Sequence, residues 1–459
     1  MFRKTILKLN QVYRGWSYFL VSGLIAIAII VSTAYPLKSE TTPSSNSSQE
    51  VKEELVDLEQ LSETVNKLES TWEKSYEGYF ERNFSNQSRS ATEIAEHLAE
   101  ISEQTGIKPA VIWAMPTPDF LELVLVTPNN ELVLKKVRSA DRETLTEIVK
   151  QLDNAIADRE SRRYLPPAKL IYRWIFEPLE SYLEAENIDT LLLCTGPTLR
   201  SLPFAALHDG EKFVIEKYSL ALIPAFNLTD TSYKKKSDQQ VLAMGASKFT
   251  DLPALPGVEV ELSTIVPKLW SGRKIFNEGF TVKNLKTLLQ QDKFDIVHLA
   301  THSKFRVGFP DNSFIQFGDR KLSLDQIANL NLNNPQVDLL VLSACETALG
   351  DKNAELGFAG LAMQAGVKSA LASLWTISDT GTVVLMSEFY QKLKLTPIKA
   401  QALRQAQIAL LKKEVFVEGR EIRGSQFPVS LPSTITETEA QNLDHPFYWA
   451  GFTLIGNPW

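Results

Sequence analysis

The sequence predicts an α/β fold, a sandwich with a mostly parallel central sheet, preceded by a transmembrane helix and a small helical and β-hairpin region. Three observations support this fold class. Short apolar runs alternate with helical stretches after about Leu165, which is typical of parallel strands covered on both faces. Three strand-like runs separated by turns precede this part, and a charge-free apolar segment lies near the N-terminus. At 459 residues, the chain is too long for one ordinary compact core.

The apolar segment runs from Trp16 to Tyr35 without a charged residue. At about 1.5 Å per residue it is long enough to cross a bilayer as a helix. Basic residues without acidic ones precede it, so the positive-inside rule leaves the N-terminus in the cytoplasm. We therefore expect a single-pass membrane protein, anchored through residues 16–35, with its bulk on the extracytoplasmic side. The alternative is a signal peptide with the small residues Ser32–Ala34 at its cleavage site, which would release a secreted protein.

Residues 1–38 thus form a cytoplasmic stub and membrane segment, and polar residues 39–49 form a flexible linker. A helical region is expected over residues 50–106. Its first helix spans Val51 to Ser70, with apolar residues at steps of three and four, and its second spans Ala91 to Glu103. Gly106 is a candidate C-terminal cap. The region is either a simple helical collar or a surface for a regulatory protein partner.

Residues 107–164 are expected to form a β-hairpin and helix that lead into the main domain at 165–459. The lead-in is expected to contain strands at Val111–Met115, Phe120–Thr127 and Leu132–Val137, and a helix at Leu145–Ile156. The main domain is expected to place five buried strands at Thr190–Cys194, Val241–Gly245, Ile296–Ala300, Leu339–Ser343 and Ala370–Leu374.

The composition argues against several classes of function. Net charge is −7 and no basic stripe is present, so we expect no nucleic-acid partner. Two cysteines are too few for a disulfide framework. The five histidines and two cysteines lack zinc-ligand spacing, and no acidic loop cluster suits calcium. We therefore expect no metal site, and the cysteine–histidine chemistry described below implies no organic cofactor.

Two predicted strands end in residues that can do chemistry together. His302 follows the strand at Ile296–Ala300, and Cys345 follows the strand at Leu339–Ser343. Functional residues collect at the carboxyl ends of parallel strands, so neighbouring strands would place the pair side by side. A thiolate beside an imidazole can attack a carbonyl, and the imidazolium can then protonate the leaving amine. The alternative is a small core cysteine and a hydrogen-bonded structural histidine.

The sequence around these residues resembles the CHAT family of caspase-clan peptidases, which is related to caspases and separases. The resemblance runs from about Leu165 to Trp459. The two central motifs are IVHLATH at Ile296–His302 and LSACETAL at Leu342–Leu349. Further matching segments are RSLPFAAL from Arg200, LPGVEVE from Leu255, GLAMQAGVKSALASLWTISD from Gly360, LRQAQ from Leu403 and HPFYWAGFTLIG from His445.

This resemblance implies a caspase-like sandwich in which Cys345 is the nucleophile and His302 the general base and acid. It also implies an oxyanion hole formed by the backbone N–H groups of Ser303 and Cys345. In the family the histidine is usually followed by glycine, whereas this chain has Ser303. Asp379 is a candidate for a substrate pocket that takes a basic side chain, or else it caps the following helix.

The expected function is a membrane-anchored cysteine endopeptidase that acts on a protein or peptide through the Cys345/His302 dyad. The alternative is a catalytically inactive CHAT-domain scaffold or binding module, which Ser303 favours. A third possibility uses the same thiol for acyl transfer, because the first half-reaction is the same.

Overall fold

The computed structural model describes residues 58–84, 88–235, 237–396, 398–426, 429–433 and 442–459. The chain divides into two units, Met1–Ser48 and Gln49–Trp459. The expected membrane segment at 16–35, the linker at 39–49 and the start of the first helix all lie outside the described residues. Within those residues, no helix combines the length and apolar character needed to span a bilayer.

Thirteen strands of the second unit form one sheet. Most of it follows the order β10-β9-β8-β11-β12-β16-β5-β4-β1-β2-β3, and β6 pairs with the first half of β8 and with β7. The strands are β1 (Pro109–Pro116), β2 (Leu121–Val126), β3 (Leu132–Val137), β4 (Thr190–Thr195), β5 (Ser219–Ile223), β6 (Val241–Gly245), β7 (Gly272–Phe276), β8 (Ile296–Phe305), β9 (Phe314–Gln316), β10 (Lys321–Ser323), β11 (Leu339–Thr347), β12 (Ser369–Ser373) and β16 (Phe452–Gly456).

The expected parallel sheet consists of two parallel halves that run in opposite directions. Strands β7, β6, β8, β11 and β12 are parallel to one another, and so are β16, β5, β4 and β1. The halves meet where β12 pairs antiparallel with β16. The carboxyl ends of β8 and β11 therefore lie at the opposite edge of the sheet from those of β4 and β5.

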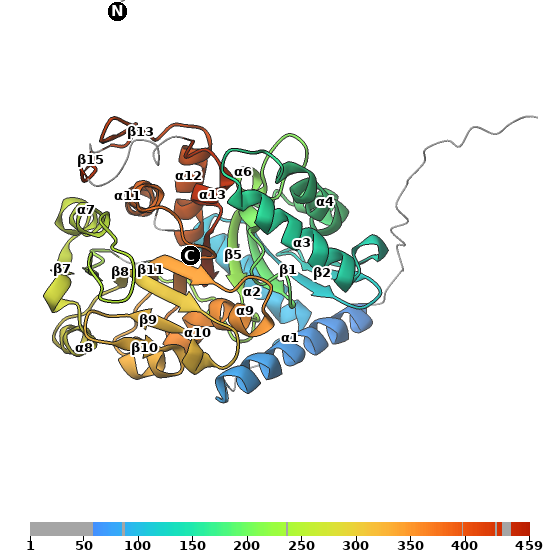
Figure 1. Ribbon diagram of the computed structural model, residues 1–459. Coiled ribbons are helices and arrows are strands. Elements are labelled where there is room, and N and C mark those ends of the chain that lie inside the picture. Colours follow the sequence, from blue (N-terminus) through green and yellow to red (C-terminus); the bar gives the residue numbers. More distant parts are fainter. Residues whose placement is uncertain (1–57, 85–87, 236, 397, 427–428, 434–441) are drawn as a thin grey trace, which may run out of the picture. The chain divides into compact units, whose positions relative to one another are not determined.

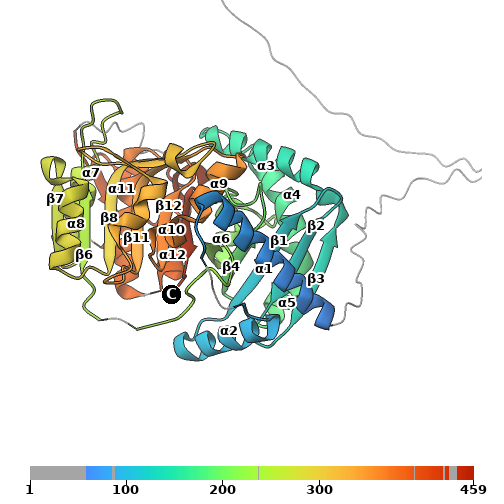
Figure 2. The ribbon, with the colours of Figure 1, turned by 90° about the horizontal axis from the view of Figure 1, so that it is seen from below.

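Helices cover both faces of this sheet (Figures 1 and 2). One layer contains α1 (Leu58–Phe80), α2 (Ala91–Thr105), α8 (Val282–Gln291), α9 (Lys352–Ala359) and α10 (Leu361–Ala365). The other contains α3 (Arg142–Ala157), α4 (Leu165–Ile175), α7 (Val258–Ser263), α11 (Asp379–Leu395) and α12 (Lys399–Leu411). Shorter helices are α5 (Glu180–Ala185), α6 (Val214–Lys217) and α13 (Pro446–Trp449).

The lead-in at 107–164 adds three strands to the main sheet, because β1 pairs parallel with β4 and continues through β2 to β3. The whole span from Gln49 to Trp459 is accordingly one compact unit. The polar stretch after α12 also contains structure that the sequence did not suggest. A small sheet forms there from β13 (Phe416–Glu418), β14 (Glu421–Arg423) and β15 (Val429–Ser430).

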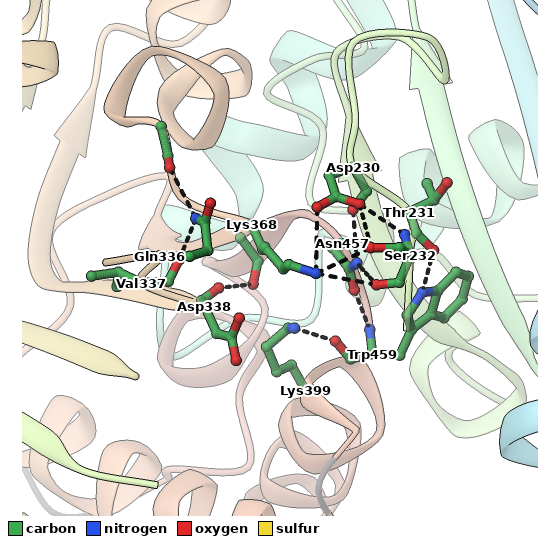
Figure 3. A network of polar contacts seen from close by, with 12 residues as sticks. Asp230, Thr231, Ser232, Gln336, Val337, Asp338, Lys368, Lys399, Asn457 and Trp459 are labelled. Atoms are coloured by element: carbon green, nitrogen blue, oxygen red, sulfur yellow. Dashed lines mark hydrogen bonds and ion pairs between the residues drawn. The ribbon is translucent and has the colours of Figure 1, made fainter. Parts of the chain in front are cut away.

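A polar network holds the junction of the two halves at the edge opposite His302 (Figure 3). The ammonium of Lys368 lies 3.3 Å from the Asp230 carboxylate and 3.2 Å from the Ser232 hydroxyl. The side-chain amide of Asn457 donates to the backbone carbonyls of Asp230 and Ser232 at 2.7 and 2.9 Å. These bonds tie the end of β16 to the segment after β5 and to the start of β12.

Candidate active site

The two residues expected to carry the chemistry lie on adjacent strands. Strands β8 and β11 are neighbours that pair in parallel, and both continue past the expected ends, to Phe305 and Thr347. The pairing starts with Leu339 opposite Ile296 and keeps this register as far as Leu342 opposite Leu299. His302 and Cys345 therefore lie near the same edge of the sheet.

A β-bulge separates the two side chains. After Leu342, the pairing resumes with Ala344 opposite His302 and Cys345 opposite Ser303. Strand β8 thus places two residues, Ala300 and Thr301, where β11 has one. Without this extra residue, His302 would lie directly opposite Cys345. A shift of one residue sends a side chain to the other face of a sheet.

The bulge leaves His302 and Cys345 on opposite faces. Side chains alternate along a strand, so Cys345 shares a face with Ser303 and Phe305. That face is covered by α9, because the Phe305 ring contacts the ring of Phe358 with centroids 5.5 Å apart. His302 faces the segment before α7. The expected side-by-side arrangement is therefore not formed in this conformation.

The imidazole of His302 contacts the loop between β6 and α7. Its Nε2 lies 2.9 Å from the carbonyl oxygen of Pro253, and because a carbonyl only accepts, Nε2 donates this bond. The ring also lies edge-on to Phe249, with centroids 5.0 Å apart. Burial lowers the pKa of His302, and the Pro253 bond opposes this shift. His302 is therefore a neutral imidazole at pH 7, as a general base must be.

The thiol of Cys345 is enclosed. The residue is 1% exposed, and its Sγ lies 3.3 Å from the carbonyl oxygen of Leu342. Burial raises the pKa of Cys345 to about 12, which the Ser373 and Ser303 contacts offset only in part. Because the thiolate is the reactive form, Cys345 is an unreactive thiol in this conformation.

The backbone groups expected to form the oxyanion hole are also engaged. The amide of Cys345 lies 3.3 Å from the hydroxyl of Ser373. Ser303 lies between β11 and β9, paired with Cys345 on one side and Ile315 on the other. It has the extended conformation of a strand residue, so this position does not require a glycine here.

Asp379, the candidate for a substrate pocket, is used inside the protein. Its carboxylate accepts a hydrogen bond from the backbone N–H of Gly257 at 3.0 Å. It is the first residue of α11 and not its cap, because the Ser378 side chain accepts from the backbone N–H of Gly381 and caps that helix. In this conformation Asp379 fixes the LPG segment, which leads into α7.

Three further features of this region involve residues outside the expected dyad. The first is an ion pair at the surface, in which Lys304 Nζ lies 2.6 Å from Glu346 Oε2. The second is a buried contact set, in which His298 Nε2 lies 3.0 Å from Glu261 Oε1 and its Nδ1 3.1 Å from the Tyr390 hydroxyl. The third is a hollow of about 530 Å³ beside the loop that holds His302, lined by residues 248–252 and 316–321. All three depend on contacts between segments that are distant in the sequence, so no local sequence pattern indicates these contacts.

No group of three or more His, Cys, Asp or Glu side chains in the described part of the chain is arranged to hold a metal ion. The side chains described at the edge of β8 and β11 are the His302 imidazole, the shielded Cys345 thiol and the Lys304–Glu346 pair.

A family model supports the class of protein that this fold and site suggest. The model described as "CHAT domain" matches residues 165–457. The chain belongs to the CHAT-domain family, and the matched region contains both β8 and β11. The family membership expected from the two central motifs is thereby confirmed.

No curated protein matches the chain. Two solved structures of the Saccharomyces cerevisiae separase–securin complex match it at 10% identity. They cover 80% and 87% of this chain and 31% and 34% of the matched chain, with TM-scores of 0.48 and 0.47. The chain thus spans about a third of the separase chains. A complex of the pro- and mature domains of RgpB from Porphyromonas gingivalis matches at 11% identity, covering 69% of this chain and 77% of that chain, with a TM-score of 0.37.

Proposed function

We propose that this protein is a cysteine peptidase that hydrolyses peptide bonds with Cys345 as nucleophile and His302 as general base and acid. One observation carries the proposal: the two residues lie near the carboxyl ends of adjacent parallel strands of the CHAT domain and are one residue out of register. Loss of the bulge at Ala300 and Thr301 would bring the two side chains opposite each other. The described conformation is then the resting state of the enzyme.

The reaction requires the aligned register, in which the bulge is lost and His302 lies opposite Cys345. His302 removes the proton of the Cys345 thiol, and the thiolate attacks the carbonyl carbon of the scissile bond. Backbone N–H groups of Ser303 and Cys345 would stabilise the oxyanion. The imidazolium then protonates the leaving amine, which leaves an acyl-thioester on Cys345. Water, deprotonated by His302, hydrolyses this thioester and restores the thiol.

The proposal includes a location and a regulatory surface. Residues 16–35 would anchor the chain in a membrane, with a cytoplasmic N-terminus and the CHAT domain on the extracytoplasmic side. The alternative is a secreted protein released by signal cleavage. A regulatory protein partner would contact α1 and α2, and the exposed face of α2 carries Glu93, Glu96, Glu100 and Glu103.

A second function is an inactive scaffold or binding module. The enclosed Cys345 thiol favours it. Ser303 contacts the thiol and Ser373 contacts the backbone amide of Cys345, as in a structural core. In that case His302 and Cys345 would serve packing alone, and neither would affect the reactivity of the other.

The two functions differ in how Cys345 labelling depends on His302. We expect an iodoacetamide probe to label Cys345 in the full chain slowly, through the aligned minority state. His302→Ala should slow this labelling by about 100-fold, because general-base activation is lost. Peptide mapping by mass spectrometry, with Cys345→Ala as the blank, measures the rate.

The matched control is His97→Ala, since His97 is a partly buried histidine on α2 that bonds Thr231. It should label at the wild-type rate. Equal labelling of wild type and His302→Ala would contradict the peptidase and support the scaffold.

A further inference from the structure

The surface ion pair between Lys304 and Glu346 is formed directly beyond the two residues of the dyad. Lys304 follows His302 by two positions on β8, and Glu346 follows Cys345 on β11. The two residues are opposite each other in the described register. Their side chains lie on the face of His302, 25% and 53% exposed, with Nζ and Oε2 2.6 Å apart.

This pair can exist only in the shifted register. If His302 were opposite Cys345, Ser303 would be opposite Glu346, and Lys304 would be opposite Thr347. Paired residues share a face and neighbouring residues alternate, so Lys304 and Glu346 would then lie on opposite faces of the sheet. The ion pair and the dyad are therefore mutually exclusive arrangements of the same two strand ends.

Other contacts of the shifted register involve the same residues. The Ser303 side chain faces Cys345 and is 1% exposed, and strand β9 pairs with Ser303 and Lys304 on the other side. The hydroxyl of Thr301 donates to the carbonyl of Gln316 at 2.5 Å, which fixes one residue of the bulge to β9. Of these contacts, only the ion pair is at the surface, where another molecule or salt can reach it.

We propose that the Lys304–Glu346 ion pair is a latch that holds β8 and β11 one residue out of register and so keeps His302 away from Cys345. This rests on the proposed peptidase function and adds its regulation. Release of the latch allows the bulge to be lost and the dyad to align. An exposed pair contributes about 0–1 kcal/mol, so a strongly charged partner segment or a change of charge suffices to shift the balance.

Charge reversal tests the latch, with alkylation of Cys345 in the full chain by iodoacetamide as the readout. Glu346→Lys places two ammonium groups opposite each other, and like charges at such positions are destabilising. We expect the labelling rate to rise by about 5- to 30-fold. The swapped pair, Lys304→Glu with Glu346→Lys, restores opposite charges and should return the rate to within about threefold of wild type.

Another ion pair of the same length provides the matched control. Arg273 and Asp292 lie 2.6 Å apart, 48% and 41% exposed, on β7 and after α8. Asp292→Lys should leave the labelling of Cys345 unchanged. Wild-type labelling of Glu346→Lys would overturn the latch, and so would a swapped pair that labels as fast as Glu346→Lys.

Adding His302→Ala to Glu346→Lys separates the latch from the peptidase. Fast labelling that depends on His302 supports both. Fast labelling that does not depend on His302 supports the latch as a device that uncovers the thiol but contradicts the peptidase function.

Discussion

Replacing Glu69 with alanine is expected to lower the free energy of unfolding by about 3–5 kcal/mol. Glu69 lies on α1 and is 1% exposed. Its carboxylate accepts hydrogen bonds from the Trp113 indole at 2.7 Å and from the backbone amides of Phe226 and Asn227 at 3.0 and 2.9 Å. Alanine would leave two buried donors and one part-buried donor without an acceptor, and each buried donor costs about 1–3 kcal/mol.

Glu69 joins α1, which precedes the family-matched region, to β1 and to the segment after β5. Figure 2 shows α1 lying across β1. Urea unfolding followed by circular dichroism measures the loss. Glu73→Ala is the matched control, because Glu73 accepts a single bond, from the Asn227 side chain at 3.1 Å. That variant should lose about 1 kcal/mol or less. Equal losses in the two variants would contradict the role given to Glu69.

Replacing Asp153 with asparagine is expected to stabilise the protein by about 2–4 kcal/mol at pH 8. Burial, with a smaller contribution from the Glu355 carboxylate, raises the pKa of Asp153 from 3.8 to about 7. Its Oδ1 is shielded from solvent and has no hydrogen-bond partner among the described residues. Ionising this group in the folded state therefore costs free energy.

The sign of the pH dependence follows from the raised pKa. The unfolded chain loses the proton near pH 4, whereas the folded chain keeps it until about pH 7. The stability associated with the protonated carboxyl is thus complete below pH 4 and is lost as the pH rises to 7. The advantage of Asp153→Asn should accordingly shrink between pH 8 and pH 5.

Urea unfolding at pH 5, 6, 7 and 8 measures this trend. Asp158→Asn, at the exposed end of the same helix, should show no comparable change with pH. A gain from Asp153→Asn that is the same at pH 5 and pH 8 would contradict the raised pKa. Asp153 bears on the candidate active site because the nearby Glu355 lies on α9, close behind β11. The Glu355 carboxylate accepts hydrogen bonds from the backbone amide of Thr198 and from the hydroxyl of Ser201.

Local signals predicted several elements of the fold well. Strand β6 has the expected bounds, Val241–Gly245. Helix α2 begins at Ala91 as expected and ends at Thr105, and Gly106 after it has the left-handed conformation of a C-terminal cap. Buried apolar runs and capping residues act over a few positions, so they can be read without knowledge of the fold. The positions of His302 and Cys345 after two predicted strands could be read in the same way, whereas the adjacency of β8 and β11 was only a condition of the strand-end argument.

Features that depend on distant partners could not be predicted in the same way. The bulge at Ala300 and Thr301 has no glycine or turn signal. It lies where β11 has the single residue Ser343 between Leu342 and Ala344, and Thr301 bonds to Gln316. The reversal of strand direction between β12 and β16 joins segments about eighty residues apart. The prediction therefore placed both strands correctly but did not include the shift of one residue in the register between β8 and β11.

Disulfide trapping tests the central claim, that the resting protein holds His302 and Cys345 one residue out of register. Paired residues on adjacent strands are about 5 Å apart, within the range that a disulfide spans. In the full chain under mild oxidation, we predict that Ser303→Cys forms a bond with Cys345. We predict that His302→Cys forms one only when Glu346→Lys is also present. Rapid bonding of His302→Cys without Glu346→Lys, together with no bonding of Ser303→Cys, would contradict the account.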